Sequence, residues 1–436
     1  MRKTILFICI LLFTTSIAAH DWFEQTSGTT KDLTTVSVVT DSVAWIGGKE
    51  GTVLRTTDQG RSWISKGGGP ELGSLDIVNI WAIDADRAIV TASQVMNNGT
   101  TAYVFRTADG GQNWTKVLTL EGGYGNGIYM FDANRGIFYS NPVGGKWPVW
   151  LTSDGGQTWD TTGVRIPVPD QDEKSFANAI CGNPGARIAV FGTNRSKIYI
   201  SNDYGKNWTA KSTPGLVNSK SVCIKYGRMM AGGEALISTM NEGDSWTEVS
   251  YPGLGEILGM GVHDNWNWWF VSKGGSNNSG NKIIHTANFG NGFWDTAYTA
   301  PGNSAYLAMS TGRDDRLWIW AVREGGGITV GEHHHGEPTD VSGNDGLTPG
   351  EFSLGQNYPN PFNPSTKIKY SLPAEGNIEL KVFDLLGREM ITLDSGQKSA
   401  GEHTLTFNAA GLASGTYIYT LRAGGQVMAK KMLLVK

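Results

Sequence analysis

One short motif, Ser/Thr-x-Asp-x-Gly-x-x-Trp, recurs along this chain and constrains its fold more than any other feature. Well-formed copies are TTDQGRSW, TADGGQNW, TSDGGQTW and SNDYGKNW, and two degenerate copies, TMNEGDSW and TANFGNGFW, carry Asn in place of Asp. Successive copies are roughly 40 to 50 residues apart, which is enough for one small antiparallel sheet per repeat. We therefore expect an all-β array of similar sheets.

The motif has a local structural explanation. Its Asp or Asn side chain can accept backbone N–H bonds across a tight turn, its Gly allows positive φ, and its Trp can pack against a neighbouring sheet. A carboxylate that recurs in every repeat is better explained by the fold than by catalysis. The structural residues are Asp58, Gly60, Trp63, Asp109, Gly111, Trp114, Asp154, Gly156, Trp159, Asp203, Gly205, Trp208, Asn241, Gly243, Trp246, Asn288, Gly290 and Trp294.

The two ends of the repeat region complement each other. Every motif Trp is followed by a segment that suits a fourth strand, and residues 22–27 have the same form without a preceding motif. The last period, residues 305–330, supplies inner strands but has no motif. We predict that residues 22–27 form the outer strand of the last blade and close a seven-bladed β-propeller, since closure removes exposed sheet edges.

These motifs resemble the Asp-box, or bacterial neuraminidase repeat, over residues 20–330. The repeat occurs in sialidases, xyloglucan-degrading endoglucanases and sortilin-type receptors, and the short blades here look most like the photosystem II assembly-factor propellers. The resemblance implies a propeller. A sialidase has an Arg-Ile-Pro segment ahead of its first Asp-box, whereas Arg165-Ile166-Pro167 follows the third motif here, so the chain departs from that family.

The composition changes after residue 330. Residues 331–350 are polar and rich in Gly and Pro, which indicates a linker. Three adjacent histidines, His333 to His335, lie in it, but neighbouring His residues in such a segment provide no fixed coordination geometry, so no metal site is expected. Alternating apolar residues in 351–436 predict a small antiparallel β-sandwich, Ig-like in form.

The signals in this last segment, NYPNPFNPST, DLLGRE, LASGTY and a terminal KKM, look like the C-terminal sorting domain of the type IX secretion system. The resemblance implies that the type IX machinery is a partner and that the chain crosses the outer membrane. The residues that carry the signal are Asn357, Pro359, Pro361, Phe362, Pro364, Gly387, Gly415, Tyr417 and Lys431.

The first 19 residues predict a secretory signal peptide. Arg2 and Lys3 precede an apolar run that is too short to span a bilayer, and small residues follow it. Without these two cations the formal net charge falls from −4 to −6, which gives no basic field for nucleic acid. No transmembrane segment is expected. We predict a secreted or outer-surface protein that passes through the periplasm.

Two cysteines remain beyond the signal peptide, Cys181 and Cys223, both in apolar, strand-like sequence. We expect two buried free thiols, because inner strands of adjacent blades can lie too far apart for a bridge. A disulfide is the alternative in an oxidising compartment.

The function suggested by these features is binding. Trp147 and Trp266 fall in expected turns, where exposed rings could stack on sugars or side chains, and core packing is the alternative. Asp84, Asp86 and Asp132 also fall in turns, where local backbone bonding explains Asp. We predict no catalytic residues and no cofactor, and a binding or scaffold propeller for an extracellular protein or polysaccharide. The alternative is a glycoside hydrolase of the Asp-box superfamily, sialidase-like or xyloglucanase-like, which requires paired carboxylates across a cleft.

Overall fold

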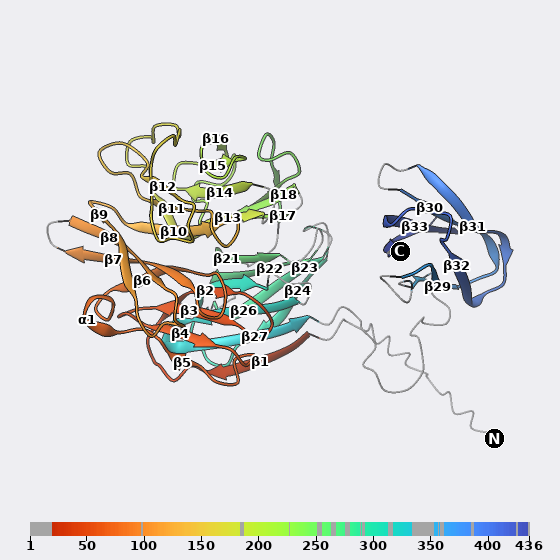
Figure 1. The fold of residues 1–436 in the computed structure, drawn as a ribbon, viewed down its shortest axis with the longest axis horizontal. Coiled ribbons are helices and arrows are strands. Elements are labelled where there is room, and N and C mark those ends of the chain that lie inside the picture. Colours follow the sequence, from red (N-terminus) through yellow and green to blue (C-terminus); the bar gives the residue numbers. More distant parts are fainter. Residues whose placement is uncertain are drawn as a thin grey trace, which may run out of the picture. The chain divides into compact units, whose positions relative to one another are not determined.

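The computed structural model divides the chain into two compact units, residues 1–335 and 336–436, here called the N-terminal and C-terminal units (Figure 1). Each is described by itself. The described residues are 20–96, 99–183, 187–225, 227–250, 255–262, 267–274, 280–287, 289, 293–312, 317–333, 353–355, 357, 362–384, 388–423 and 426–434.

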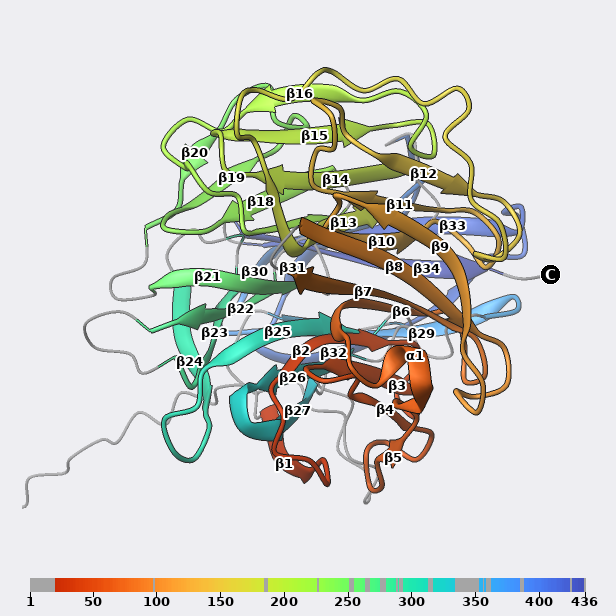
Figure 2. The ribbon, with the colours of Figure 1, turned by 90° about the vertical axis from the view of Figure 1, so that its left-hand side faces the viewer.

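The described residues of the N-terminal unit form seven antiparallel sheets, six with four strands and one with three (Figure 2). The first strand of each sheet contacts the first strands of its two neighbours, and the series returns from the last sheet to the first. The all-β propeller prediction is confirmed. These inner strands are β2 (Leu33–Val38), β6 (Asp76–Ala82), β10 (Gly125–Met130), β13 (Ser175–Asn183), β17 (Ser221–Lys225), β21 (Glu256–Val262) and β25 (Tyr306–Thr311).

The second and third strands of each sheet continue outward from the inner strand. They are apolar along most of their length because neighbouring sheets cover both faces. Gly47 shows how close the sheets approach, since a Cβ there would lie 2.6 Å from Ile77 Cγ2 in the next sheet. The second strands are β3 (Ala44–Gly48), β7 (Ala88–Met96), β11 (Gly136–Ser140), β14 (Ile188–Thr193), β18 (Arg228–Gly232), β22 (Trp268–Lys273) and β26 (Leu317–Arg323), and the third strands are β4 (Val53–Thr56), β8 (Gly99–Thr107), β12 (Val149–Thr152), β15 (Lys197–Ser201), β19 (Leu236–Thr239), β23 (Lys282–Ala287) and β27 (Gly327–His333).

The outer strand of the last sheet comes from the beginning of the described chain. β1 pairs antiparallel with β27, from His20 opposite His333 to Thr26 opposite Gly327, which confirms the predicted pairing of the two ends. Glu24 in β1 forms an ion pair with Arg323 of β26. The outer strands are β1 (His20–Thr26), β5 (Ile64–Ser65), β9 (Thr115–Glu121), β16 (Thr209–Ser212), β20 (Thr247–Glu248) and β24 (Phe293–Thr299).

The third sheet departs from the prediction. A fourth strand was expected after Trp159, but the sheet contains only β10, β11 and β12 among the described residues. A single bridge joins Leu151 to Asp160, and Arg165 then forms a parallel bridge with Asn207 of the following sheet. The prediction of a fourth strand here is wrong because the chain leaves this sheet after one pair of residues and crosses to its neighbour.

The C-terminal unit consists of two antiparallel sheets, which confirms the predicted sandwich. One shared core lies between them, with Ile368 and Tyr370 from the first sheet and Leu380, Tyr419 and Leu421 from the second. The first sheet contains β28 (Ser353–Leu354), β29 (Ser365–Leu372) and β32 (Gly401–Asn408), and the second contains β31 (Glu389–Lys398), β30 (Gly376–Phe383), β33 (Gly415–Ala423) and β34 (Gln426–Leu434).

The helical elements with described bounds are the short α1 (Gly69–Leu72) and the 3-10 turn η2 (Glu324–Gly326), and Phe289 also has 3-10 conformation. Neither has the length of a membrane-spanning helix, and the described residues contain no helix that could cross a bilayer.

Candidate functional site

The inner strands surround a central cavity of about 400 Å³. Its wall includes hydroxyl, amide, thiol and thioether side chains, such as Thr35, Asn79, Cys223 and Met260. Lys225 is the one charged side chain among the lining residues that the structure describes, and none of these residues is Asp or Glu. The described wall therefore offers polar contacts but no pair of carboxylates.

Asn178 extends across this cavity from the inner strand of the fourth sheet. Its backbone is in the left-handed region, with φ of 61°, within an irregular stretch of β13 between Ser175 and Ile180. Its side-chain amide donates to the carbonyl of Thr34 in the first sheet (2.9 Å) and accepts from the amide of Asn79 in the second (2.7 Å). The contact joins three sheets, which explains why an Asn tolerates this conformation.

The two cysteines lie side by side on the cavity wall. Cys181 in β13 and Cys223 in β17 are free, and their Sγ atoms are 3.4 Å apart. The expectation of free thiols agrees with the structure, but the premise that adjacent inner strands lie too far apart is wrong here. The hydrogen bond with Cys223 lowers the pKa of the Cys181 thiol, and the N–H of Ile224 also points at its Sγ.

The repeat motifs form closed turns on the outer part of the sheets. Asp58 Oδ1 accepts from the backbone N–H of Ser62 (3.0 Å), and the Thr56 hydroxyl accepts from the N–H of Gly60 (2.9 Å). The side chains of four equivalent residues accept the same bond, each from the backbone N–H of the residue four places later. They are Asp109, Asp154, Asp203 and Asn241. Asn288 and Gly290 of the last motif lie outside the described residues.

These turns hold their carboxylates in the ionised form. The backbone N–H of Asn113, together with its side-chain amide, lowers the pKa of Asp109 to about 2. Hydrogen bonds from the side chain and backbone of Ser62 lower the pKa of Asp58. A general acid needs a pKa raised toward neutrality, so these aspartates are unsuited to that role and serve the turn.

The glycines and tryptophans of the motifs complete this arrangement. Gly60, Gly111, Gly156, Gly205 and Gly243 all have positive φ. Each tryptophan that is placed by a contact meets its own turn, its own sheet or the preceding sheet. Trp63 Nε1 donates to Gln25 and Trp114 Nε1 to the Lys66 carbonyl, Trp159 and Trp208 donate to the carbonyls of Gly156 and Gly205, Trp246 packs with the apolar cluster around Ile198, and Trp294 packs against Phe270.

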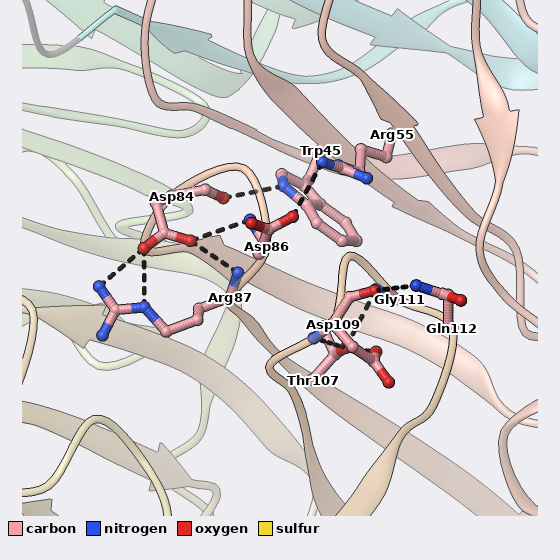
Figure 3. A network of polar contacts seen from close by, with 9 residues as sticks. All are labelled: Trp45, Arg55, Asp84, Asp86, Arg87, Thr107, Asp109, Gly111 and Gln112. Carbon is pink, nitrogen blue, oxygen red and sulfur yellow. Dashed lines mark hydrogen bonds and ion pairs between the residues drawn. The ribbon is translucent and has the colours of Figure 1, made fainter.

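The aspartates between the first two strands of a sheet also stabilise turns (Figure 3). Asp84 Oδ1 accepts from the N–H groups of Asp86 and Arg87, and its backbone carbonyl accepts from Trp45 of the preceding sheet (3.2 Å). Asp86 forms an ion pair with Arg55 of that sheet. Asp132 repeats the turn one sheet later. None of these three carboxylates lines the central cavity.

The structure describes only one of the two tryptophans predicted to bind a ligand. Trp266 lies outside the described residues. Trp147 is 5% exposed and packs against Phe191 and Tyr199 of the next sheet, at ring distances of 5.1 and 5.4 Å. The prediction of an exposed ring at Trp147 is wrong, because aromatic side chains of the next sheet cover it. It nevertheless forms part of the wall of an outer groove of about 560 Å³, a feature that the sequence did not indicate.

The described sorting-signal residues stabilise the C-terminal sandwich. The backbone N–H of Asn357 donates to the Tyr419 hydroxyl (2.8 Å), and Phe362 is 2% exposed in the core. The Tyr417 hydroxyl donates to the Ala413 carbonyl (2.9 Å). Pro364 lies just before β29, Gly415 begins β33 and Lys431 lies in β34, whereas Pro359, Pro361 and Gly387 lie outside the described residues.

Residues 356–436 match the family model described as "Secretion system C-terminal sorting domain". The match covers every strand of the sandwich except β28, which lies just before it. This unit is a sorting domain. A sorting domain of this kind supports export by the type IX secretion machinery and a secreted or cell-surface location. The search of curated proteins found no match to the chain.

The solved structures to which the chain is similar include those of YCF48. A structure of YCF48 bound to a D1 peptide has a TM-score of 0.55 at 14% identity, and the match covers 71% of this chain and 94% of that one. YCF48 from Cyanidioschyzon merolae has the same TM-score at 15% identity and covers 71% and 98%. At such identities the likeness shows the fold, and it agrees with the predicted resemblance to the assembly-factor propellers.

Proposed function

We propose that this protein is an exported binding or scaffold module whose propeller engages an extracellular protein or polysaccharide. One observation carries the proposal. The described wall of the central cavity contains amides, hydroxyls, sulfur atoms and one lysine, but no Asp or Glu. A glycoside hydrolase needs two carboxylates about 5 to 9 Å apart on either side of the bond it cleaves. The described cavity wall supports binding over hydrolysis.

A peptide is bound in one solved structure of similar fold. The YCF48 structure shows a propeller of this kind with a peptide bound, although a shared fold does not carry the ligand across. A photosystem assembly role does not suit a chain with a sorting domain, because that domain directs the chain out of the cell. An exported ring whose cavity wall carries polar and apolar side chains is suited to contacts with surface proteins or glycans.

The proposal predicts binding without turnover. The full chain, labelled with a fluorophore, is applied to a glycan array and to an array of peptides from surface proteins of the same cell envelope. We expect saturable binding with Kd in the micromolar range, about −8 kcal/mol, to one class of probe. Heat-unfolded chain is the control for adhesion. Release of reducing sugars from a bound glycan would contradict the proposal and favour the hydrolase.

A further inference from the structure

The outer edge of the third sheet carries backbone groups that point away from it. Leu151 in β12 pairs outward with Asp160, through N–H to O contacts of 2.6 and 2.8 Å. The Pro148 carbonyl points inward and accepts from Ser140 (3.2 Å). Because backbone groups alternate along an edge strand, the N–H and C=O of Val149 also point outward. No hydrogen bond joins them to another described residue.

The chain leaves this edge open because of a local turn. Asp160 Oδ1 accepts from the N–H and the hydroxyl of Thr162, at 2.9 and 2.7 Å. This is the side-chain turn that Asp favours, and it diverts the chain after one pair. Arg165 then pairs with the fourth sheet, where its N–H donates to Lys206 and its carbonyl accepts from Trp208. The position beside Val149 that Thr162 would occupy in a regular fourth strand is therefore vacated.

A groove of about 560 Å³ lies between this edge and the diverted segment. Its volume is within the range of roughly 300 to 1,000 Å³ seen for ligand sites. Trp147, Trp208 and Ile166 form apolar parts of its wall, and Val149 contributes the edge. Val149 lines this groove and is otherwise buried, with 2% of its surface exposed.

The charges around the groove have one sign. Lys146 and Arg165 line it, both are exposed, and neither forms an ion pair with a described residue. Its described lining contains no Asp or Glu. An occupant with a carboxylate would meet two cations and no like charge, which gives electrostatic complementarity.

We propose that this groove binds an extended peptide segment of a partner protein, which adds to β12 as the missing fourth strand and places an acidic side chain near Lys146 and Arg165. The peptide backbone exchanges hydrogen bonds with Val149, as in other strand-addition complexes. Alternate side chains then face the tryptophans, and the others face solvent and the two cations. The inference rests on the proposed binding function and specifies its surface and ligand.

The test uses fluorescence anisotropy with the full chain and a fluorescein-labelled octapeptide of alternating Glu and Val. We expect binding that weakens at least tenfold in the double variant Lys146→Glu/Arg165→Glu. The matched control is Lys174→Glu/Lys273→Glu, two exposed lysines outside the groove lining, which should bind as the parent does. A peptide of alternating Lys and Val should bind at least tenfold more weakly than the acidic one.

A second probe tests the backbone contact without changing the protein. N-methylation of alternate peptide bonds removes the donors on one edge of the octapeptide, and each of the two possible patterns is measured. One pattern should abolish binding and the other should leave it within threefold. Equal binding by both patterns would overturn strand addition. If the array experiment finds a ligand whose binding is unchanged in Lys146→Glu/Arg165→Glu, the groove is wrong while the binding function stands.

A different observation concerns the thiol pair on the cavity wall. Cys181 and Cys223 lie on neighbouring inner strands with Sγ atoms 3.4 Å apart, and the chain carries an export domain. We infer that the two cysteines become a disulfide between the fourth and fifth sheets once the chain meets an oxidant outside the cytoplasm. The two protein thiols lose two protons and two electrons when their sulfur atoms form a bond. Oxidised glutathione takes up these protons and electrons, its own disulfide breaks, and two glutathione thiols are released.

The disulfide is tested on the reduced full chain with oxidised glutathione. We expect loss of the titratable thiols of Cys181 and Cys223, a cross-link between their two peptides in a non-reducing digest and a Tm that rises by several degrees. Cys181→Ser is the control, in which oxidised glutathione should leave Tm unchanged. Two thiols that stay free under conditions that oxidise an unfolded sample, or a cross-link between two chains, would overturn the inference.

Discussion

Deletion of residues 20–30 should lower the Tm of the full chain by roughly 10 °C, because it removes β1 and so leaves the last sheet of the ring without its outer strand. All seven residues of β1 pair with β27. The deletion also leaves Arg323 without Glu24, and the Arg323 side chain is only 7% exposed. Removal of one partner of a buried ion pair costs about 3 to 5 kcal/mol. The expected shift is measured by calorimetry.

Two point variants test whether the contacts of β1 with the last sheet, and not the loss of residues alone, account for the lower Tm. Glu24→Ala leaves the buried Arg323 unpaired and removes a contact to Thr329, so it should account for much of the loss. Glu50→Ala is the matched control, since Glu50 pairs with Lys31 at the surface, where both side chains are well exposed. Surface pairs contribute about 0 to 1 kcal/mol. An unchanged Tm in the deletion would refute the closure role of β1.

The features that the sequence predicts well are those with local causes. The turn around Asp58 depends on Thr56, Gly60 and Ser62, which lie within a few residues of one another, so one motif contains the whole arrangement. The pairing of β1 with β27 is not local, yet it was predicted because each end of the repeat region lacks what the other supplies.

The outer groove escaped prediction because its causes are spread over two sheets. The motif before Trp159 predicts a fourth strand, and only the contact of Arg165 with Lys206 and Trp208 shows that the chain crosses to the next sheet. Trp147 lies in a turn-like sequence, but Phe191 and Tyr199 of that same sheet bury its ring. One signal was available, since Asp160 followed by two threonines favours a turn that competes with a strand.

The contacts in the central cavity also could not be predicted from the sequence. Alternation predicts which residues of an inner strand face inward, but an irregularity in β13 places Asn178 across the cavity against Asn79. The separation of Cys181 and Cys223 likewise depends on how two neighbouring strands approach. Sequence reasoning therefore predicts the ring, while the contacts that line the central cavity and the outer groove come from the packing of one sheet on the next.

Removal of residues 356–436 should abolish export across the outer membrane and reduce the extracellular fraction of the chain at least tenfold in a host with a type IX secretion system. The reason is that this segment is the sorting domain, and the contacts of Asn357, Phe362 and Tyr417 show that its signal residues belong to one folded sandwich. The measurement is immunoblotting of medium, cell-surface and periplasmic fractions.

The truncated chain should accumulate in the periplasm as a folded ring. The reason is that the N-terminal unit has its own cores, such as the cluster around Trp320 and Val330. Resistance of the periplasmic chain to protease measures whether the ring is folded. The reciprocal experiment attaches residues 353–436 to an unrelated periplasmic reporter, which should then appear outside the cell. Export of the truncated chain at the parent level would contradict a sorting role. Retention of the reporter, with loss of the truncated chain from the medium, would mean that the machinery also recognises the propeller, because the sandwich would then be necessary but insufficient for passage.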